Sequence, residues 1–412
     1  MKILIVSQSD IGGGAARAAY RLHKSLLSID VNSMMLVQSK HSDDHTVIGP
    51  ETKLKKGFAQ FRPTLDKLPV QFYKKRTKTP FSPAWLPYSG VVKHINDINP
   101  DIVHLHWING GFIKIKDVSR IKYPIVWTLH DMWPFTGGCH YNNEGCVKFI
   151  ESCDLCPVLG SKKYYDLSYR TFKRKIKYYN NLPITVVGLS KWLTESAKNS
   201  KLFGRKNIIN LPNPIDTEIF KPLDKHIARE MLGMPQEKKI ILFGASKATD
   251  TPRKGFKELT EALRLVNASN VELAVFGSGT PQNPPDFSFP VHYLGRFNDD
   301  LSLSVLYSAA DVMVVPSLQE NLSNVIMESL SCGTPVVAFD IGGNGDMIDQ
   351  KINGYLAKPY DPSDLASGIE WILNNSNDKN LSDNCRSKVI NNFEMKIVAK
   401  KYIELYEDIL RK

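Results

Sequence analysis

Short apolar runs alternate with segments of helical periodicity along most of this chain. Near the N-terminus, the apolar run Lys2 to Ser7 leads into a glycine-rich loop and a helix that extends to Leu27. In the second half, the apolar run Val312 to Val315 is followed by a loop and by Asn324 to Leu330, where the apolar spacing is helical. Short, fully apolar strands that alternate with helices are typical of parallel sheets covered on both faces. The pattern therefore predicts an α/β protein with doubly wound parallel sheets.

The residues between these segments continue the alternation. We predict further strands at 33–37, 101–107, 124–133, 184–189, 238–244 and 271–276, and a last helix at 395–410. With 412 residues, of which 42% are hydrophobic and 23% charged, the chain has an ordinary globular composition. Its length suffices for two domains, each with its own core.

Charge and cysteine usage bear on the partners and the compartment. The net charge of +11 predicts an acidic partner, which would be nucleic acid, an anionic lipid surface or a phosphorylated substrate. Six cysteines, four of them clustered, do not form the pattern of a secreted disulfide framework. No run of about 18 apolar residues occurs, and the run from Met1 to Ser7 is too short for a signal peptide. We therefore expect a cytoplasmic protein that does not span a membrane.

Two carboxylates in the stretch from Pro316 to Asp346 suggest a ligand site. Glu320 lies in the loop just after a buried strand, where doubly wound sheets bind ligands, and Glu328 lies about two turns into the next helix. The residues between them offer backbone N–H groups at a helix start, which suits a phosphate; these are Asn321, Leu322, Ser323 and Asn324. A bare pair of glutamates is a weak signal, since most glutamates on helix faces are solvated.

The two glutamates, the CGTPVVA segment that follows them and the subsequent GG loop resemble the signature of the family-4 retaining glycosyltransferases of GT-B fold. The resemblance implies two Rossmann-like domains that face each other across a cleft. The acceptor domain would span 1–212, the nucleotide-sugar domain 213–394, and a final helix at 395–412 would cross back. It also implies that Glu320 is catalytic and faces the transferred sugar, while Glu328 hydrogen-bonds the nucleotide ribose.

The glycine-rich loop after the first strand does not match a dinucleotide fingerprint. The third small position holds Arg17, and the second strand ends in Gln38 rather than in an acid for a ribose, so NAD binding is disfavoured. The resemblance places Gly13 and Gly14 beside the donor phosphates and the acceptor. Glycines needed only for a tight turn remain the alternative.

The resemblance also assigns a strand-end histidine. His130 matches the family's histidine that hydrogen-bonds the transferred sugar, which makes it the second catalytic candidate. His106 and Asp131 lie near it at strand ends. A strand-end histidine without this pattern is more often structural.

Further donor-binding residues follow from the resemblance. Lys254 matches the family's lysine on the donor diphosphate, but Ala245 and Ser246 stand where the family has an early arginine, so Arg253 or Lys247 would substitute. Two cations beside a diphosphate would stabilise the charge of the leaving group without a metal, so no cofactor is expected for catalysis. Contacts with the base are implied for the backbone of Arg296 and Phe297.

Four cysteines cluster in the segment TGGCHYNNEGCVKFIESCDLCP; they are Cys139, Cys146, Cys153 and Cys156. Four thiolates at this separation could hold a structural zinc ion, although the first spacing is not that of a standard zinc knuckle. Free cysteines and a redox pair remain alternatives. This segment lies outside the general family pattern and resembles a subgroup of polysaccharide-assembly enzymes.

Two stretches mix basic and aromatic residues. The first spans 51–88, where prolines are expected to break any long helix, and the second is a basic helix at 162–179. Such interleaving suits an anionic lipid surface, a phosphorylated acceptor or single-stranded nucleic acid, while a merely solvated face remains open. Nucleic acid is not expected as a partner, because no RNA-binding signature accompanies these stretches.

The sequence thus predicts a retaining glycosyltransferase that moves a sugar from a UDP- or GDP-sugar to a glycan acceptor. By resemblance to colanic-acid-type enzymes, the acceptor would be a glycan linked to a polyprenyl diphosphate, in the synthesis of a bacterial capsule, O-antigen or exopolysaccharide. The enzyme would work as a peripheral protein at the inner face of the cell membrane. A nucleotide-sugar epimerase of GT-B fold and a nucleic-acid-binding protein are the alternatives.

Overall fold

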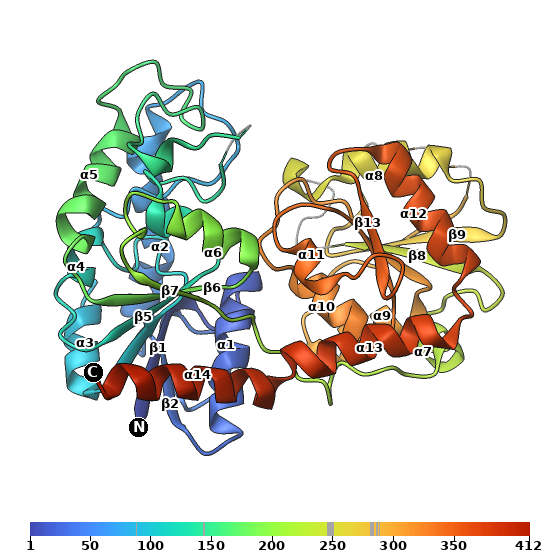
Figure 1. Cartoon of the computed structure of the whole chain (residues 1–412), viewed down its shortest axis with the longest axis horizontal. Coiled ribbons are helices and arrows are strands. Elements are labelled where there is room, and N and C mark those ends of the chain that lie inside the picture. The colour runs from blue at the N-terminus through green and yellow to red at the C-terminus, as the bar shows by residue number, and fades with distance from the viewer. Residues whose placement is uncertain (88, 143–144, 245–250, 281–283, 286, 288) are drawn as a thin grey trace. The chain divides into compact units, whose positions relative to one another are not determined.

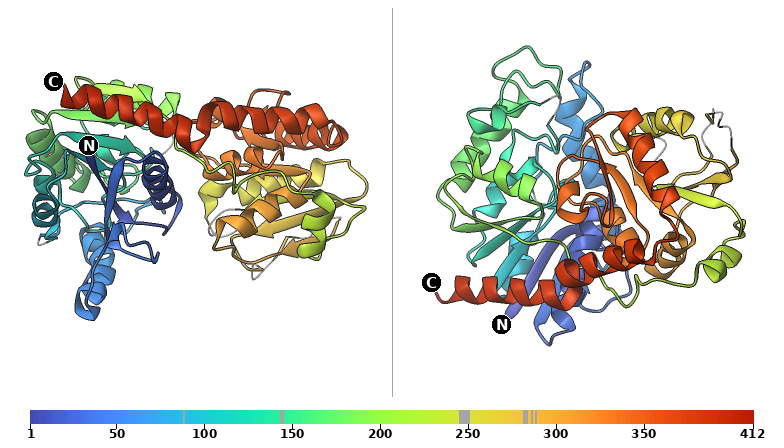
Figure 2. Two further views of the ribbon diagram at one scale, coloured as in Figure 1. Left: turned by 90° about the horizontal axis from the view of Figure 1, so that it is seen from below. Right: turned by 45° about the vertical axis from the view of Figure 1, so that its right-hand side comes forward.

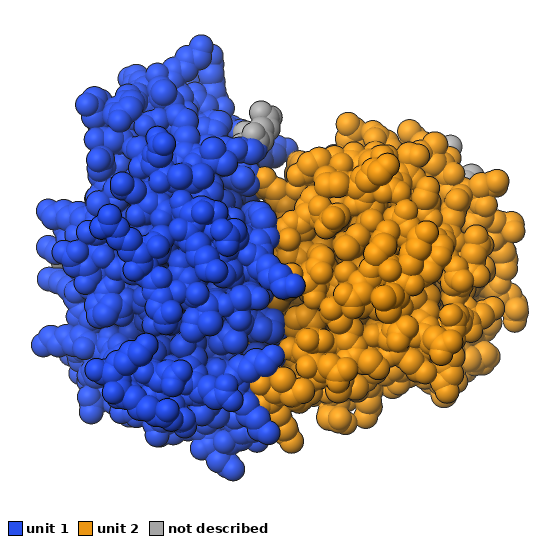
Figure 3. Space-filling model, in the orientation of Figure 1, with its two compact units in different colours: residues 1–213, 398–412 blue, residues 214–397 orange. Residues whose placement is uncertain are grey.

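The computed structural model describes residues 1–87, 89–142, 145–244, 251–280, 284–285, 287 and 289–412. The chain forms two compact units, of which unit 1 comprises Met1–Asn213 with Val398–Lys412 and unit 2 comprises Pro214–Ile397 (Figures 1 and 3). Each unit is built on one sheet in which every strand pair is parallel, as predicted. The expected boundaries after residues 212 and 394 differ from these units by one and three residues.

Unit 1 contains a seven-stranded sheet of order β3-β2-β1-β4-β5-β6-β7. Its strands are β1 Lys2–Ser9, β2 Asn32–Ser39, β3 Val47–Ile48, β4 Ile102–Leu105, β5 Ile125–Leu129, β6 Ile184–Gly188 and β7 Asn207–Asn210. Its helices are α1 Gly14–Leu27, α2 Lys53–Gln71, α3 Val91–Ile98, α4 Ile115–Val118, α5 Leu167–Tyr179, α6 Lys191–Lys198 and α14 Met395–Leu410. Short 3-10 turns at Trp133–Phe135 and Lys148–Ile150 lie in the loop after β5.

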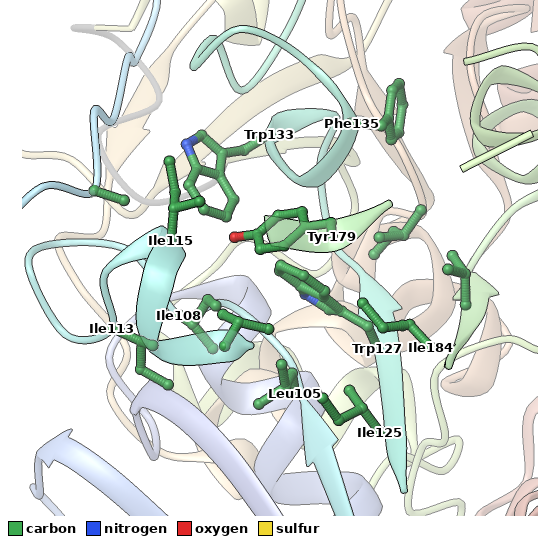
Figure 4. Close-up of a cluster of buried hydrophobic side chains, with 14 of the residues drawn as sticks. Leu105, Ile108, Ile113, Ile115, Ile125, Trp127, Trp133, Phe135, Tyr179 and Ile184 are labelled. Carbon is green, nitrogen blue, oxygen red and sulfur yellow. The ribbon is translucent and has the colours of Figure 1, made fainter. Parts of the chain in front are cut away.

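Both faces of this sheet are buried, because alternate residues of a strand point to opposite sides. Leu4 and Val6 of β1 pack into one hydrophobic cluster, whereas Ile3 and Ile5 pack into another on the opposite face. The first cluster is rich in aromatic rings (Figure 4): Trp127 meets Tyr179 edge-on, with 5.5 Å between the ring centroids. The strand residues are therefore mostly apolar, which is the pattern that the sequence displays.

The last helix, α14, belongs to unit 1 from Val398 onward. Tyr402 and Tyr406 of α14 pack against the second cluster, and the hydroxyl of Tyr406 lies 2.7 Å from Nδ1 of His104 on β4. Nε2 of His104 contacts the Thr128 hydroxyl on β5, also at 2.7 Å. A buried histidine thus joins two strands to the C-terminal helix.

The structure contradicts one expectation in unit 1. Prolines 63 and 69 do not break the chain; they lie inside α2, which runs for 19 residues. The helix survives because Thr52 caps its start and because its buried side is held by tertiary contacts, which outweigh the poor helix propensity of proline. Among the described residues, no helix combines the length and apolar character needed to cross a membrane.

Unit 2 contains a six-stranded sheet of order β10-β9-β8-β11-β12-β13. Its strands are β8 Lys239–Gly244, β9 Val271–Phe276, β10 Val291–Tyr293, β11 Val312–Val315, β12 Val336–Phe339 and β13 Gly354–Ala357. Its helices are α7 Lys225–Met231, α8 Phe256–Leu265, α9 Asp300–Ala309, α10 Asn324–Ser331, α11 Asn344–Met347, α12 Pro362–Asn374 and α13 Lys379–Phe393, with a 3-10 turn at Pro252–Lys254. The strand order reverses between β8 and β11, and ligands bind at such a switch point in doubly wound sheets.

The buried histidines make stability depend on pH. His23 on α1 is fully buried between the hydroxyls of Ser33 and Thr46, and burial lowers its pKa from 6.5 to about 4. Between these two pH values the unfolded chain binds a proton that the native state does not. The free energy of unfolding should therefore fall by about 1.4 kcal/mol per pH unit for this site as the pH drops from 6.5 to 4.

The test is urea unfolding at pH 7.5 and 5.5, followed by tryptophan fluorescence, which reports mainly on unit 1. We expect His23→Gln, which keeps a polar side chain but cannot titrate, to lose less stability on acidification than the wild type. Equal losses in the two proteins would contradict this role for His23.

Candidate active site

The loops that follow β8 and β11 meet at the switch point of unit 2. Lys254, at the end of the 3-10 turn after β8, donates to Oε2 of Glu320 in the loop after β11, at 2.8 Å. Nη1 of Arg253 lies 3.8 Å from the same carboxylate oxygen and donates to the Gln319 carbonyl at 2.7 Å. Two cations and one carboxylate, predicted from separate segments, are thus brought together.

Two glycines allow the backbones of these loops to approach closely. Gly255 has φ +73°, and a Cβ atom there would lie 1.8 Å from the Pro316 carbonyl oxygen. Gly342, after β12, has φ +54°, and its Cβ would lie 1.8 Å from the carbonyl oxygen of Glu320. No residue with a side chain fits at either position, so the Glu320 loop is held from both sides by glycine.

Glu320 is ionised at neutral pH. Burial alone would raise the pKa of its carboxyl group, but the charges of Lys254 and Arg253, a hydrogen bond from Lys254 and one from the Asn321 N–H lower that pKa below its usual value. The carboxylate can therefore accept hydrogen bonds from hydroxyl groups. It also fixes both cations in place.

Glu328 lies on α10 and is buried. The hydroxyl of Tyr307 on α9 donates to its Oε2 at 2.8 Å. Asn321, Leu322 and Ser323 are buried in front of α10, and the side chain of Ser323 does not cap the helix. The N-terminal partial charge of α10 thus lies in the segment between the two glutamates.

A chain of aromatic rings connects Glu328 with the residues expected at the base. Phe297 meets Phe276 edge-on at 6.4 Å between centroids, and Phe276 meets Tyr307 edge-on at 5.9 Å. Arg296, beside Phe297, is exposed. Ser246 and Lys247, which the sequence also suggested, lie outside the described residues.

In unit 1, the glycine-rich loop follows β1. Gly13 has φ +107° and caps α1, whose first residue is Gly14. The loop is tied to the end of β2 by the buried carboxylate of Asp10, which accepts from the N–H groups of Ile11, His41 and Ser42. Burial opposes ionisation of Asp10, but these hydrogen bonds lower its pKa. The conformation of the loop thus requires glycine at position 13.

His130 lies at the end of β5, next to a second histidine. Its Nε2 atom is 2.9 Å from Nδ1 of His106, which follows β4. Burial lowers the pKa of His130 to about 4 and that of His106 well below 6.5. Both rings are therefore neutral at physiological pH. Nε2 of His106 is buried and has no hydrogen-bond partner within the described part of the chain.

Asp131, beside His130, has a structural role. Its carboxylate accepts from Trp107 Nε1 and from the Trp133 N–H, both at 2.9 Å, and lies 2.6 Å from Nδ1 of His140. Burial acts against its ionisation, but these partners lower its pKa. The Asp131 carboxylate thus holds the start of the loop after β5, next to His130, through hydrogen bonds.

The four clustered cysteines, Cys139, Cys146, Cys153 and Cys156, are free and line one cavity of about 20 Å³, which has room for a single water-sized occupant. Burial raises the pKa of Cys139 to about 12 and that of Cys156 to about 11, so zinc would have to displace protons. Among the described residues, no three His, Cys, Asp or Glu side chains are close enough to hold a metal ion as they stand. The zinc site stays a prediction, to be tested by elemental analysis.

The basic helix predicted at 162–179 begins only at Leu167, where Asp166 caps α5, and some of its basic side chains are buried. Lys175 of α5 is fully buried, where its ammonium group donates to the carbonyls of Trp133 and Thr136 and lies over the Trp133 ring. Arg174 donates to the Pro83 carbonyl at 2.9 Å. These two residues serve the fold rather than a basic surface.

Two sequence profiles cover most of the chain. The profile of Glycosyltransferase Family 4 matches residues 12–219, which is half of the chain, and that of Glycosyl transferases group 1 matches residues 237–375. The chain belongs to glycosyltransferase family 4. The resemblance read from Glu320 and Glu328 is thereby confirmed at the level of the family, and the protein is a glycosyltransferase.

Curated relatives of this glycosyltransferase carry the same general activity in their names. An uncharacterized glycosyltransferase of Methanocaldococcus jannaschii is 29% identical over 323 residues, which are 74% of this chain and 75% of that protein. A D-inositol 3-phosphate glycosyltransferase of Streptosporangium roseum is 30% identical over 282 residues, which are 65% of this chain and 60% of the relative.

Solved structures share the fold of this glycosyltransferase. Sucrose-phosphate synthase of Thermosynechococcus elongatus has a TM-score of 0.68 at 18% identity and full coverage of both chains. HepE of Anabaena, solved in complex with UDP-glucose, has a TM-score of 0.63 at 18% identity, with 99% of this chain and 100% of HepE covered. At such identities the likeness shows the fold alone, which is the predicted GT-B fold of two Rossmann-like domains.

Sequence reasoning missed several residues of this site. Tyr307 lies in α9, an apolar helix before β11, and no local sequence pattern indicates that it contacts Glu328. The two adjacent glycines mark the loop after β12 in the sequence. They do not show that Gly342 packs against the backbone of Glu320, which is distant in sequence. Asp10 could have been suspected, because it directly follows a buried strand, where doubly wound sheets place functional polar groups.

Substitution of Gly342 tests the packing around Glu320. Gly342→Ala should destabilise unit 2 by about 1–3 kcal/mol, since it adds a steric overlap to a left-handed backbone, and should lower sugar transfer by displacing Glu320. Thermal unfolding and transferase assays measure both effects. Gly345→Ala is the matched control, because the nearest side-chain atom to its Cβ would be Oδ1 of Asp340 at 3.6 Å, an ordinary van der Waals contact. Unchanged melting and activity for Gly342→Ala would refute this account.

Proposed function

We propose that this glycosyltransferase transfers a sugar from a UDP- or GDP-sugar to a glycan acceptor with retention of configuration. The observation that carries the proposal is the cluster of Lys254, Arg253 and Glu320 at the switch point of unit 2, beside the start of α10 and close in sequence to Glu328. The cations and the helix start match a diphosphate, while the two carboxylates match sugar hydroxyls. Retention rests on the family pattern around Glu320 and Glu328.

In the proposed donor complex, each part of the nucleotide sugar has a matching group in unit 2. Glu328 accepts hydrogen bonds from the ribose, and the segment at Arg296 and Phe297 contacts the base. Lys254 and Arg253 lie against the diphosphate. The complex of HepE with UDP-glucose supports a UDP-sugar as the first donor to test.

Transfer requires that the bond between the sugar and the diphosphate breaks. Negative charge then grows on the diphosphate, and Lys254 and Arg253 would stabilise it without rearrangement, because Glu320 already holds both cations in position. The ionised Glu320 would orient the sugar through its hydroxyls. His130, which is neutral, would supply a further hydrogen bond to the sugar.

We propose a lipid-diphosphate-linked glycan as the acceptor and the inner face of a bacterial cell membrane as the place of action, in the assembly of a capsule, O-antigen or exopolysaccharide. The net charge of +11 supports an acidic surface. The phosphate in the name of the D-inositol 3-phosphate glycosyltransferases favours an anionic acceptor. An epimerase needs no acceptor, so a reaction that requires an acceptor would also exclude the epimerase alternative.

The assignment of Glu328 predicts a specific loss of nucleotide affinity. Glu328→Gln, which keeps an oxygen for Tyr307, should weaken UDP or GDP binding by about 1.5–3 kcal/mol, the value of a charge-assisted hydrogen bond. Glu320→Gln should lower turnover more than nucleotide affinity. Calorimetry and initial rates would separate the two effects, after a thermal-shift screen with UDP-, GDP- and ADP-sugars has identified the donor.

Glu261→Ala provides the control, since Glu261 is an exposed glutamate of α8 that pairs with Lys257 in the same helix. It should behave like the wild type. Equal nucleotide affinity in Glu328→Gln and the wild type would eliminate the ribose assignment, and unchanged turnover in Glu320→Gln would eliminate the catalytic one.

We also expect transfer without a divalent metal, because Lys254 and Arg253 supply the charge that a metal would otherwise supply. Activity should be unchanged after incubation with EDTA, whereas Lys254→Met should lower both donor binding and turnover. An activity that disappears with EDTA and returns with Mg²⁺ or Mn²⁺ would disprove the claim. The zinc content of the protein should be measured in parallel, because zinc bound by the cysteine cluster would be structural and would not bear on this claim.

A further inference from the structure

Large apolar side chains are exposed along the whole of α2. Leu54 is 87% exposed, Phe61 68% and Phe72, directly after the helix, 86%. The full set, called the α2 ridge below, is Leu54, Phe58, Phe61, Leu65, Leu68 and Phe72. Exposed apolar residues scattered singly are ordinary, but five on one helix and a sixth directly after it are not.

The ridge occupies one side of the helix. Its members are separated by alternating steps of four and three residues, so at about 100° per residue they fall within an arc of roughly 80°. Phe72 continues the helical backbone beyond Gln71, with φ −67° and ψ −14°. In Figure 2 (left), α2, coloured light blue, projects beyond the remainder of unit 1.

The other side of α2 is fixed to unit 1. Buried Arg62 donates to the carbonyls of Gly111 at 2.6 Å and Pro87 at 3.0 Å. Trp85 donates through its indole N–H to the Asp66 carbonyl at 3.2 Å. The helix is thus held in one orientation, and the ridge is presented outward by the fold.

The exposed charged side chains of α2 itself are all basic. Lys53, Lys55, Lys56 and Lys67 of α2 are exposed, and the helix's single acid, Asp66, is buried. A cavity of about 520 Å³ at the end of α2 adds further cations; its lining includes Lys67, Lys74, Arg76, Lys78 and Phe81. An occupant that covers the ridge must therefore be apolar in its centre and anionic at its edge.

A second copy of the chain does not meet this requirement. Pairing two α2 ridges would bring lysines against lysines, and α2 offers no exposed carboxylate to neutralise them. An anionic bilayer meets it, because acyl chains cover the apolar side chains while headgroup phosphates face the lysines.

We propose that α2 lies in the surface of an anionic bilayer, with the ridge in the boundary of the acyl layer and the basic cavity at the level of the headgroups. This inference rests on the proposed membrane location and names the element that contacts the lipid. It also gives the binding an apolar component, which salt does not screen, besides the electrostatic component that salt weakens. Tyr164 and Tyr165, exposed just before α5, adjoin this region, since the Leu167 N–H donates to the hydroxyl of Tyr73 beyond α2.

The experiment is flotation of the full-length protein with vesicles of phosphatidylglycerol and phosphatidylcholine, or of phosphatidylcholine alone, at low and high salt. The ridge variant is Phe58→Ser, Phe61→Ser and Phe72→Ser. Its matched control is Met231→Ser, Leu301→Ser and Ile352→Ser, which removes three similarly exposed apolar side chains from unit 2. A charge variant neutralises Lys67, Lys74, Arg76 and Lys78.

We expect the wild type and the control to bind anionic vesicles and to retain part of this binding at high salt. The ridge variant should bind roughly tenfold more weakly and lose the salt-resistant part, whereas the charge variant should lose the salt-sensitive part. Hydrogen exchange at residues 54–72 should slow on vesicle binding in the wild type. Equal binding of the ridge variant and the control, or unchanged exchange in α2, would overturn the proposal.

Two further outcomes have definite meanings. Self-association of the wild type without lipid, abolished in the ridge variant, would identify a second copy as the occupant and overturn the bilayer assignment. Nucleotide affinity of the ridge variant, measured in the same preparations, should equal that of the wild type. Vesicle binding thus tests this inference, and nucleotide affinity measured in the same preparations tests the proposed donor site independently.

Discussion

The close approach of three loops around Glu320 is the constraint on which the candidate site depends. Parallel strands deliver the loops after β8, β11 and β12 to one edge of the sheet, but only glycine at positions 255 and 342 lets their backbones touch. This packing places Lys254 and Arg253 against Glu320. The ion cluster is thus a product of backbone geometry, and its fixed charges need no reorganisation when a charged ligand binds.

Two ways of burying polar side chains occur in this protein. Unit 2 keeps ions at its sheet edge, because a carboxylate and two cations offset the cost of burying one another. Unit 1 buries histidines that burial holds neutral, so His104 and His23 join elements through hydrogen bonds without any charge. The first arrangement suits recognition of a diphosphate, and the second gives a rigid scaffold that presents His130.

The surface of unit 1 shows how tertiary contacts override local preference. Prolines at 63 and 69 disfavour a helix, yet Arg62 and Asp66 anchor α2 along its buried side. The same anchoring determines which side chains remain outside. The six apolar residues of the ridge are exposed because the opposite side of α2, which carries Arg62 and Asp66, is the side held against unit 1.

The sequence by itself determined the fold class, most strand positions and the family, since apolar runs and the spacing of Glu320 and Glu328 are local patterns. It also determined that Lys254 and Glu320 belong to strand-end loops. Only the tertiary structure decided that these two form an ion pair, that Tyr307 contacts Glu328 and that Lys175 is buried. These facts depend on contacts between segments far apart in the chain, which no local periodicity encodes. The course of α2 through its prolines was decided in the same way, by contacts that outweigh propensity.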